Sequence, residues 1–195
     1  MLSLAVLLIL TGAASAIPPP HSHRIPSDHT CTAATCAFSP AHFTASSVIK
    51  RANFVGDLAI YLYWNVSSDE QHIEVAVDVR NAPSGWVALG LSANGGMMGA
   101  DVWRLMEGAD GELELTDMFV EDWTTPRVDT EQNLYLIASR QEPGHTSFAF
   151  SRNTATCDGG AQRYNAAFGN EDFDIGGVNG DNQHAGQLIW AVSDT

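Results

Sequence analysis

Hydrophobic and polar residues alternate along most of the chain after residue 57. Apolar side chains occupy every second position in Leu58 to Val66, and the same period returns in Ile73 to Val79. A two-residue period is that of a β-strand with one packed face. Comparable signals occur in six further segments, which are 86–92, 101–106, 112–121, 133–140, 145–152 and 187–193. About eight short strands separated by turn residues predict an all-β chain folded as an antiparallel β-sandwich.

The N-terminal residues have a different pattern. Leu2 to Leu10 is almost uninterrupted apolar sequence, and Ala14-Ser15-Ala16 forms a small-x-small cleavage site. This pattern predicts a secretory signal peptide over residues 1–16, hence a secreted, extracellular protein. The apolar run is too short to cross a bilayer as a helix, which needs ~20 residues, so no membrane span is expected. Residues 17–47, rich in proline, serine and histidine, predict a mobile leader, with docking of its Cys31/Cys36 loop on the domain as one option, and residues 48–195 predict the folded domain.

The charge of the chain excludes some partners. The formal net charge is −14, with only nine lysine and arginine residues. Such a balance argues against nucleic acid or an anionic membrane as partner. It suits calcium or a cationic partner, although a solvated acidic surface explains it equally simply.

Three cysteines and one glycosylation sequon fit the secretory route. Cys31 and Cys36 are close enough in sequence for a short-loop disulfide. Cys157 is then free, paired between molecules, or paired with one of the other two. Asn65 begins the only Asn-x-Ser/Thr sequon, at the end of a predicted strand.

The segment Gly85 to Trp103, GWVALGLSANGGMMGADVW, resembles the central signature of DOMON domains. Two later segments, Phe148 to Asp158 and Leu188 to Ala191, are similar to the branch found at the N-terminus of dopamine β-monooxygenase-like proteins. The resemblance covers about Phe54 to Val192. It implies an immunoglobulin-like antiparallel β-sandwich in a secreted protein, and it says less about function because this module does different work in different proteins.

The glycine loop suggests a haem ligand by resemblance. In the cytochromes of the family a methionine of this loop is an axial ligand of haem b, and Met97 stands at the matching position. The opposite ligand would be a histidine of a later loop, with His184 best placed and His145 second. The alternative is that the methionine only packs beneath its own loop.

The resemblance also implies a cation site. In the monooxygenase branch an aspartate at the position of Asp101 helps to hold a metal ion. The matching shell would be Asp101, the carbonyls of Val102 and Met118, and the Asn133 side chain. Oxygen ligands of this kind suit calcium or sodium, although Asn133 replaces an aspartate of the relative and removes one charge. Alternatively, Asp101 caps its glycine loop through backbone N–H groups.

These features predict a stand-alone module that binds a ligand or cation (haem, sugar or calcium) and has no turnover of its own. No catalytic motif is present, and the resemblance does not extend to the copper domains that perform monooxygenase chemistry. One alternative is a b-type cytochrome passing single electrons through Met97 and His184. Another is an adhesion or matrix module with an extracellular protein partner. A pocket for a small ligand is expected among five residues, which are Trp86, Met98, Trp103, Phe150 and Trp190.

Overall fold

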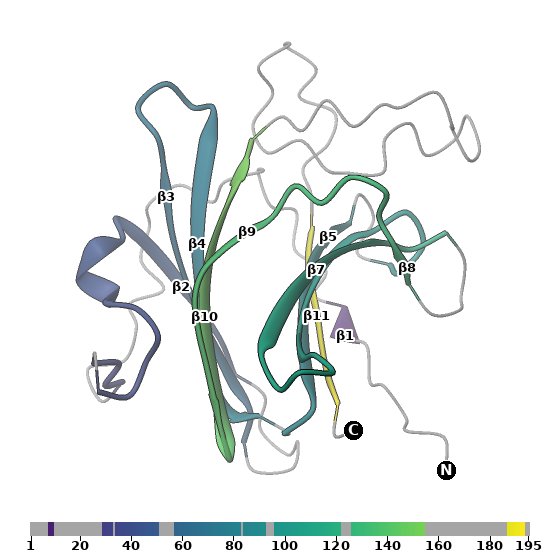
Figure 1. Cartoon of the computed structure of the whole chain (residues 1–195). Coiled ribbons are helices and arrows are strands. Elements are labelled where there is room, and N and C mark those ends of the chain that lie inside the picture. Colours follow the sequence, from purple (N-terminus) through teal and green to yellow (C-terminus); the bar gives the residue numbers. More distant parts are fainter. Residues whose placement is uncertain are drawn as a thin grey trace.

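The computed structural model describes residues 8–9, 29–32, 34–50, 57–82, 84–92, 96–121, 126–154 and 187–193. These residues form two antiparallel β-sheets packed face to face, with a 3-10 turn over Pro40–His42 (Figure 1). The arrangement confirms the predicted all-β sandwich.

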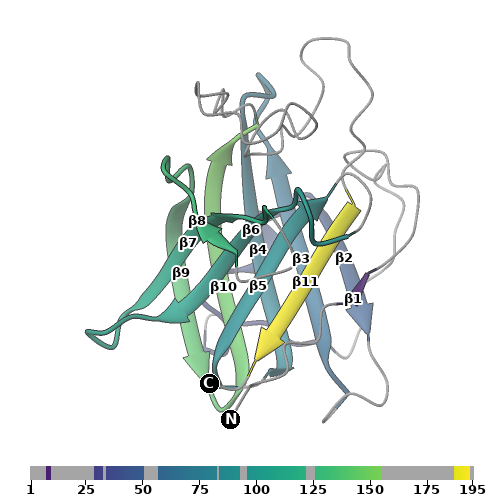
Figure 2. The ribbon, with the colours of Figure 1, turned by 90° about the vertical axis from the view of Figure 1, so that its right-hand side faces the viewer.

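The six-stranded sheet has the order β1-β11-β5-β6-β7-β8, and every neighbouring pair is antiparallel (Figure 2). Its strands are β1 (Leu8–Ile9), β11 (Gln187–Ser193), β5 (Trp86–Ser92), β6 (Asp101–Glu107), β7 (Leu113–Phe119) and β8 (Arg127–Val128).

The five-stranded sheet has the order β2-β3-β4-β10-β9, again antiparallel throughout. Its strands are β2 (Ala45–Lys50), β3 (Ala59–Val66), β4 (His72–Ala82), β10 (Gly144–Asn153) and β9 (Tyr135–Glu142).

All eight predicted strands are present, and β5 and β11 have the predicted bounds. The largest difference at a strand end is in β4, which continues to Ala82 rather than ending at Val79, and β9 begins at Tyr135 rather than Asn133. Three strands were not predicted: β1, β2 and β8. Strand β2 lies across the expected end of the leader because its first half, Ala45 to Ser47, has no large apolar residue to set a period.

The core between the sheets consists of the alternating apolar positions. Leu62 of β3 pairs with Val77 of β4, and Leu89 of β5 pairs with Trp103 of β6, so each pair points to one face. These faces meet in one cluster whose largest buried members are Leu58, Ile60, Phe148, Phe150, Trp103, Leu105 and Trp190. Full burial of each such side chain contributes about 1.5–3 kcal/mol, so this cluster is the main stabilising element.

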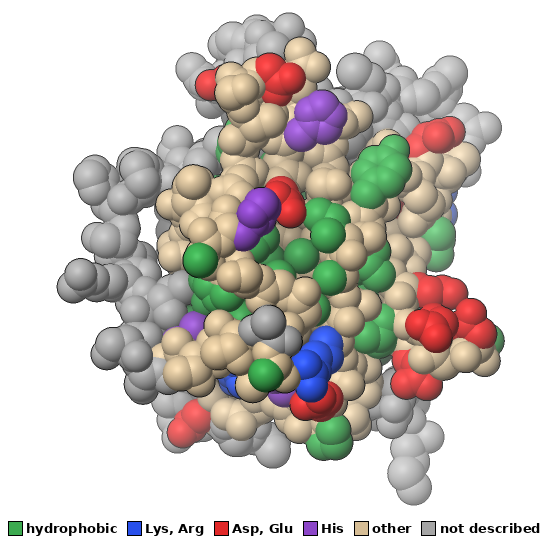
Figure 3. Space-filling view, turned by 60° about the vertical axis from the view of Figure 1, so that its left-hand side comes forward, with side chains coloured by type: hydrophobic (Ala, Val, Ile, Leu, Met, Phe, Trp, Pro, Cys, Tyr) green, Lys and Arg blue, Asp and Glu red, His purple; other side chains and the backbone are tan. Residues whose placement is uncertain are grey.

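The outer face of the five-stranded sheet is also covered. Phe38 and Phe43, from the predicted leader, pack on Tyr63, with Phe38 at 5.4 Å between ring centroids. The Ala37 N–H donates to Ser147 Oγ at 2.9 Å, which fixes the segment to β10. The view toward this face shows apolar side chains near its centre and histidine and acidic ones beside them (Figure 3). Part of the predicted leader therefore belongs to the folded body.

Two glycines are required by their surroundings. A Cβ on Gly90 would lie 2.4 Å from the Asp101 carbonyl oxygen, so only glycine permits β5 to approach β6 this closely. Gly144 has φ +75° in the turn between β9 and β10, a conformation that other residues adopt at a cost. The first of these glycines sits in the strand that leads to the methionine loop.

Candidate functional sites

The methionine loop between β5 and β6 is tied to the end of β7. The Gly99 N–H donates to the Val120 carbonyl at 2.8 Å, and the Val120 N–H donates to the Ala100 carbonyl at 3.0 Å. Ser92 Oγ donates to the Gly96 carbonyl at 2.7 Å across the loop mouth. These bonds hold Met97 in place because they fix the loop on both sides of it.

Met97 packs on an apolar cluster that lies on the outer face of the six-stranded sheet. Its strand residues alternate with residues that point into the core, and its other members come from the methionine loop and the end of β7. Its members are Trp86, Ala88, Ala100, Val102, Met118, Val120 and Ile189. An antiparallel sheet commonly leaves its outer face to water, so an apolar outer face is a distinctive feature.

The five predicted pocket residues are not brought together. Trp103, Phe150 and Trp190 lie in the core between the sheets, where Trp103 and Phe150 contact edge to face with ring centroids 5.2 Å apart. Trp86 is on the opposite face of its sheet, and Met98 is half-buried in the loop. The three core residues are packed against one another and their neighbours, so they contribute to stability at their described positions.

The structure describes only one of the two histidines considered as haem ligands. His184 lies outside the described residues. His145 pairs in register with Arg80 of β4 and points to the outer face of the five-stranded sheet, where it contacts Asp78. Met97 lies on the outer face of the other sheet, so both layers of the sandwich separate it from His145.

Asp101 opens β6 and is completely buried. Its Oδ2 accepts a hydrogen bond from Arg152 Nη1 at 2.7 Å, and both side chains are 0% exposed. The Arg152 guanidinium also lies over the Trp103 ring, 5.3 Å from its centroid. A buried carboxylate requires a positive or hydrogen-bonding partner, and Arg152 provides one here. The arginine and a bound cation would compete for this oxygen.

The remaining residues of the predicted cation shell lie nearby in the sheet. Val102 of β6 pairs directly with Met118 of β7. The Asn133 backbone N–H donates to Asp117 Oδ2 at 3.3 Å. The structure thus places a second buried carboxylate, Asp117, beside Asn133, which the sequence analysis missed. A cation bound by Asp101, Val102, Met118 and Asn133 stays a prediction.

Asp117 belongs to a local hydrogen-bond network that closes the end of the sheet. Gln132 Nε2 donates to the carbonyls of Asp117 and Asp129, at 3.0 and 3.1 Å, and Gln132 Oε1 accepts from the Asp117 N–H. The Asp129 N–H donates to the Asp117 carbonyl at 3.0 Å. This network holds β8 beside β7 and explains why polar residues are buried there.

The Asn65 side chain joins β3 to the covering segment. Asn65 Nδ2 donates to the His42 carbonyl at 2.8 Å, and its Oδ1 accepts from the Thr44 N–H at 2.7 Å and the Thr44 hydroxyl at 2.9 Å. The asparagine therefore has a structural role at this position. Glycosylation of the same nitrogen stays a prediction.

The cysteines follow one of the expected pairings. Cys31 and Cys36 form a disulfide, with Cα atoms 5.5 Å apart. Cys157 lies outside the described residues. The disulfide closes a loop directly above Asp78 of β4, a buried residue that alternates with core valines and that the sequence analysis passed over. A charged residue in an alternating strand normally indicates a solvent-facing position, so the alternating pattern did not indicate that Asp78 is buried.

Comparison with known proteins agrees with the fold. The family model described as "DOMON domain" matches residues 56–167, more than half of the chain. The chain therefore belongs to the DOMON domain family. It is similar to "DBH-like monooxygenase protein 1" of Gallus gallus, with 32% identity over 104 residues, which are 53% of this chain and 16% of that protein. The chain thus matches only a small part of that relative's length.

One solved structure is also similar. It is the cytochrome domain of Myriococcum thermophilum cellobiose dehydrogenase, with a TM-score of 0.43, 15% identity and coverage of 54% of each chain. Among the described residues, no helix is long and apolar enough to cross a membrane.

Proposed function

We propose that this protein is a secreted binding module that does not itself catalyse a reaction, and that its ligand site is at the Met97 loop. One observation carries the proposal: the outer face of the six-stranded sheet is apolar where water would normally be expected, and Met97 packs at that face. The buried members of this cluster are at most 8% exposed, and apolar side chains shielded from water are the usual lining of a small-ligand site.

Haem b is the ligand that we favour for this site. The Met97 thioether is a soft, neutral donor that suits one axial position of haem iron. The buried side chains of Ala88, Val102, Met118 and Ile189 would form the aliphatic wall against which the flat macrocycle packs. Bound haem would supply one-electron transfer. The opposite axial ligand that we propose is His184.

Secretion is part of the proposal. A disulfide such as Cys31–Cys36 forms readily in oxidising compartments and is rare in the cytosol. The apolar run followed by small residues at the N-terminus has the form of a secretory signal. Both features are independent of the ligand and support an extracellular location.

The test is an absorbance spectrum of the purified secreted protein before and after addition of haem, and then with dithionite. A Soret band that sharpens on reduction, with resolved α and β bands, is the expected result for six-coordinate haem. Met97→Leu keeps the side-chain volume but removes the sulfur, so it should abolish the six-coordinate spectrum. Met106→Leu, a methionine of β6 outside the cluster, is the matched control.

A flat visible spectrum with added haem would reject haem as the ligand. The apolar face would then be screened with other small ligands, using the fluorescence of Trp86 as the signal because this side chain lies at the cluster. No response of Trp86 to any ligand would reject the site itself.

A protein partner is a second candidate function, favoured by strand β9. Three consecutive residues of this edge strand are exposed, Tyr135 at 63%, Leu136 at 36% and Ile137 at 53%. Exposed apolar residues along a strand edge are suited to pairing with another chain. Ile137→Asp should abolish binding of such a partner without altering the haem spectrum.

A further inference from the structure

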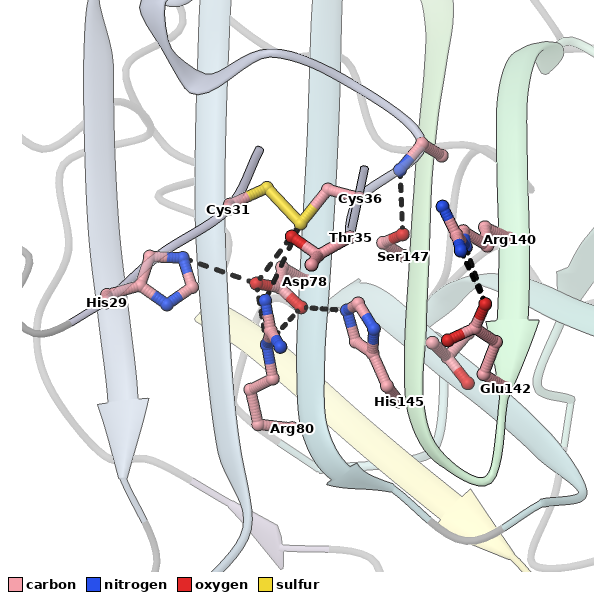
Figure 4. Close-up of polar contacts among 12 residues, drawn as sticks. His29, Cys31, Thr35, Cys36, Asp78, Arg80, Arg140, Glu142, His145 and Ser147 are labelled. Carbon is pink, nitrogen blue, oxygen red and sulfur yellow. Dashed lines mark hydrogen bonds and ion pairs between the residues drawn. A yellow bond between two sulfur atoms is a disulfide. The ribbon is translucent and has the colours of Figure 1, made fainter. Parts of the chain in front are cut away.

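The outer face of the five-stranded sheet carries a second cluster of reactive side chains, separate from the Met97 loop (Figure 4). Asp78 of β4 is 0% exposed at its centre. His145 Nε2 lies 2.7 Å from Asp78 Oδ1, and His29 Nε2 lies 3.2 Å from Asp78 Oδ2. Arg80 Nε donates to the carboxylate at 3.0 Å. Two histidines and an arginine therefore surround one buried carboxylate.

The disulfide sits directly on this carboxylate. Cys36 Sγ lies 3.7 Å from Asp78 Oδ2 and 3.6 Å from Arg80 Nη2. His29 stacks on Tyr61, with ring centroids 3.6 Å apart, so its imidazole is held against the sheet. The two sulfurs and two imidazoles thus approach Asp78 from the covering segment and from β10.

These donor atoms fall into two sets with metal-ligand spacing. One set is His29, Cys31 and Asp78, the other is Cys36, Asp78 and His145, and the atoms of each set lie within 4.8 Å of one another. Tetrahedral zinc holds its ligand atoms about 3.3–3.8 Å apart, at bond lengths of about 2.0–2.3 Å. Small movements of the side chains would bring the donor atoms of either set to the separations that tetrahedral zinc requires. The sulfurs, however, are bonded to each other and cannot ligate as thiolates.

Two opposite charges lie beside Cys36 Sγ, the Arg80 guanidinium at 3.6 Å and the Asp78 carboxylate at 3.7 Å, and they act in opposite senses on reduction of the disulfide. A disulfide bond breaks when a thiolate attacks one sulfur and the other leaves as a thiolate. The positive guanidinium of Arg80, next to Cys36 Sγ, stabilises a thiolate that leaves at Cys36. The imidazoles of His29 and His145 both contact the Asp78 carboxylate, which lies beside Cys36 Sγ. Arg80 is therefore the group in the cluster that would assist release of the thiolate, against the Asp78 carboxylate.

We infer that the Cys31–Cys36 disulfide is a reducible cap on a zinc site that draws its four ligands from Cys31, Cys36, His29, His145 and Asp78. A dithiol reductant gives two electrons and two protons to the disulfide and itself becomes a disulfide. The two thiols then lose their protons as they bind a divalent metal ion together with imidazole and carboxylate. Thiolate and imidazole ligands select zinc over calcium or magnesium, so zinc is the ion of choice.

Arg80 must move for the metal to enter. Its side chain is 30% exposed, and Nη2 donates to the Thr30 carbonyl at 3.1 Å, so the guanidinium lies at the edge of the cluster. Arg80→Gln should consequently raise the zinc affinity of the reduced protein, because a competing cation is removed. The same change should make the disulfide harder to reduce, because the leaving thiolate loses its partner.

The experiment compares zinc binding by the oxidised and the reduced protein. The secreted protein is reduced with a phosphine under argon, desalted and titrated with zinc against a chromophoric chelator. We expect one bound zinc per reduced chain and none per oxidised chain. Cobalt in place of zinc should give the charge-transfer absorption of a thiolate complex.

Single ligand variants locate the site. His29→Ala and His145→Ala should each weaken zinc binding by more than tenfold, since even loss of an outer partner of a metal ligand costs about 10- to 100-fold. His42→Ala is the matched control, because His42 lies on the same face, paired with Glu74, with 60% of its side chain exposed. Cys157→Ser should leave the number of zinc ions bound per reduced chain unchanged.

Three results would overturn the inference. The first is a reduced wild-type protein that binds no zinc. The second is zinc binding that survives both histidine substitutions at full affinity. The third is a disulfide that the phosphine reduces only after the protein has been unfolded.

Discussion

At the scale of single residues, the most consequential feature is the number of buried charges. Asp78 and Asp101 are both fully buried, and each is neutralised by an arginine, with His29 and His145 also facing Asp78. Removing one partner of a buried ion pair leaves the other charge uncompensated in a medium of low polarity. Stability therefore depends on these residues more than on the surface charges that give the protein its net charge.

Arg152→Met should lower the free energy of unfolding by about 3–5 kcal/mol, because it strips the buried Asp101 carboxylate of its cation. Urea denaturation measures this loss. Adding Asp101→Asn to Arg152→Met should recover part of it. Arg140→Met, which removes a half-exposed pair with Glu142, should cost less than about 1 kcal/mol. Equal losses for the two arginines would contradict the ion-pair interpretation.

Tyr63 provides a prediction about alkaline pH. Its hydroxyl is buried and has no hydrogen-bond partner among the described residues. Burial, and then the charge of Asp78, raise the pKa of Tyr63 above its ordinary value of about 10. Below pH 10 the tyrosine is protonated in both states. Above it the unfolded state loses the proton first, so stability falls with increasing pH.

Tyr63→Phe should therefore raise the free energy of unfolding at neutral pH by about 1 kcal/mol, since it removes an unsatisfied buried hydroxyl. It should also flatten the decline in stability above pH 10. Urea titrations at several pH values give both quantities. Tyr135→Phe, at an exposed position, should change neither. A destabilised Tyr63→Phe protein would mean that the hydroxyl has a partner in solution.

At the scale of elements, the segment of residues 34–43 changes the character of the sheet it covers. Strands β3 and β10 are apolar on both faces: Tyr63 contacts Phe38 and Phe43 of this segment, Tyr61 and Ala149 belong to the same cluster, and their neighbours point into the core. The segment itself has no strand period, and only its two phenylalanines indicate a buried face. Its position depends on contacts with residues about 25 to 110 positions away.

Phe38→Ala should loosen this segment more than the sandwich beneath it. Phe38 contacts Phe43 and Tyr63, with ring centroids 5.7 and 5.4 Å away, and these contacts would be lost. We expect faster proteolytic cleavage within residues 34–43 and faster amide exchange there, with a loss of about 1–3 kcal/mol in global stability. Phe119→Ala, in the six-stranded sheet, should not increase cleavage of this segment selectively.

At the scale of the whole molecule, the two ends of the sequence meet. Strand β1 pairs with β11, with Leu8 opposite Trp190 and Ile9 opposite Ile189. Leu8 and Ile9 fall within the proposed signal peptide. Cleavage after Ala16 would therefore remove β1 and leave β11 as an edge of the six-stranded sheet. The mature protein would then have an open edge next to the apolar face at Met97.

Mass spectrometry of the secreted protein should give a chain that begins at Ile17. Ala14→Leu combined with Ala16→Leu should block this cleavage, because the signal peptidase needs small residues there. Digestion with an amidase specific for N-glycans should reduce the mass if Asn65 is modified, and Asn65→Gln should abolish that change. A secreted chain that retains Leu8 would contradict the proposed processing.

The type of fold and most of its strands could be predicted from the amino-acid sequence. Alternation at Leu58 to Val66 and Ile73 to Val79 reports which side chains face a core, because the two-residue period is a property of the strand backbone. The same reasoning fixed β5 and β11 to the residue. The methionine loop could be located because its glycines and paired methionines are local features. The short separation of Cys31 and Cys36 made their disulfide one of the pairings that the sequence left open, and the structure has this pairing.

The residues that cover each outer face could not be predicted from the sequence and became known from the three-dimensional structure. Asp78, with its polar side chain in an alternating strand, looks solvent-exposed, yet a distant segment buries it under a disulfide. Trp86 and Trp103 look alike in sequence, yet one faces outward and the other inward. Periodicity states that a side chain points to one face or the other. What covers that face depends on long-range contacts, which a local pattern does not contain.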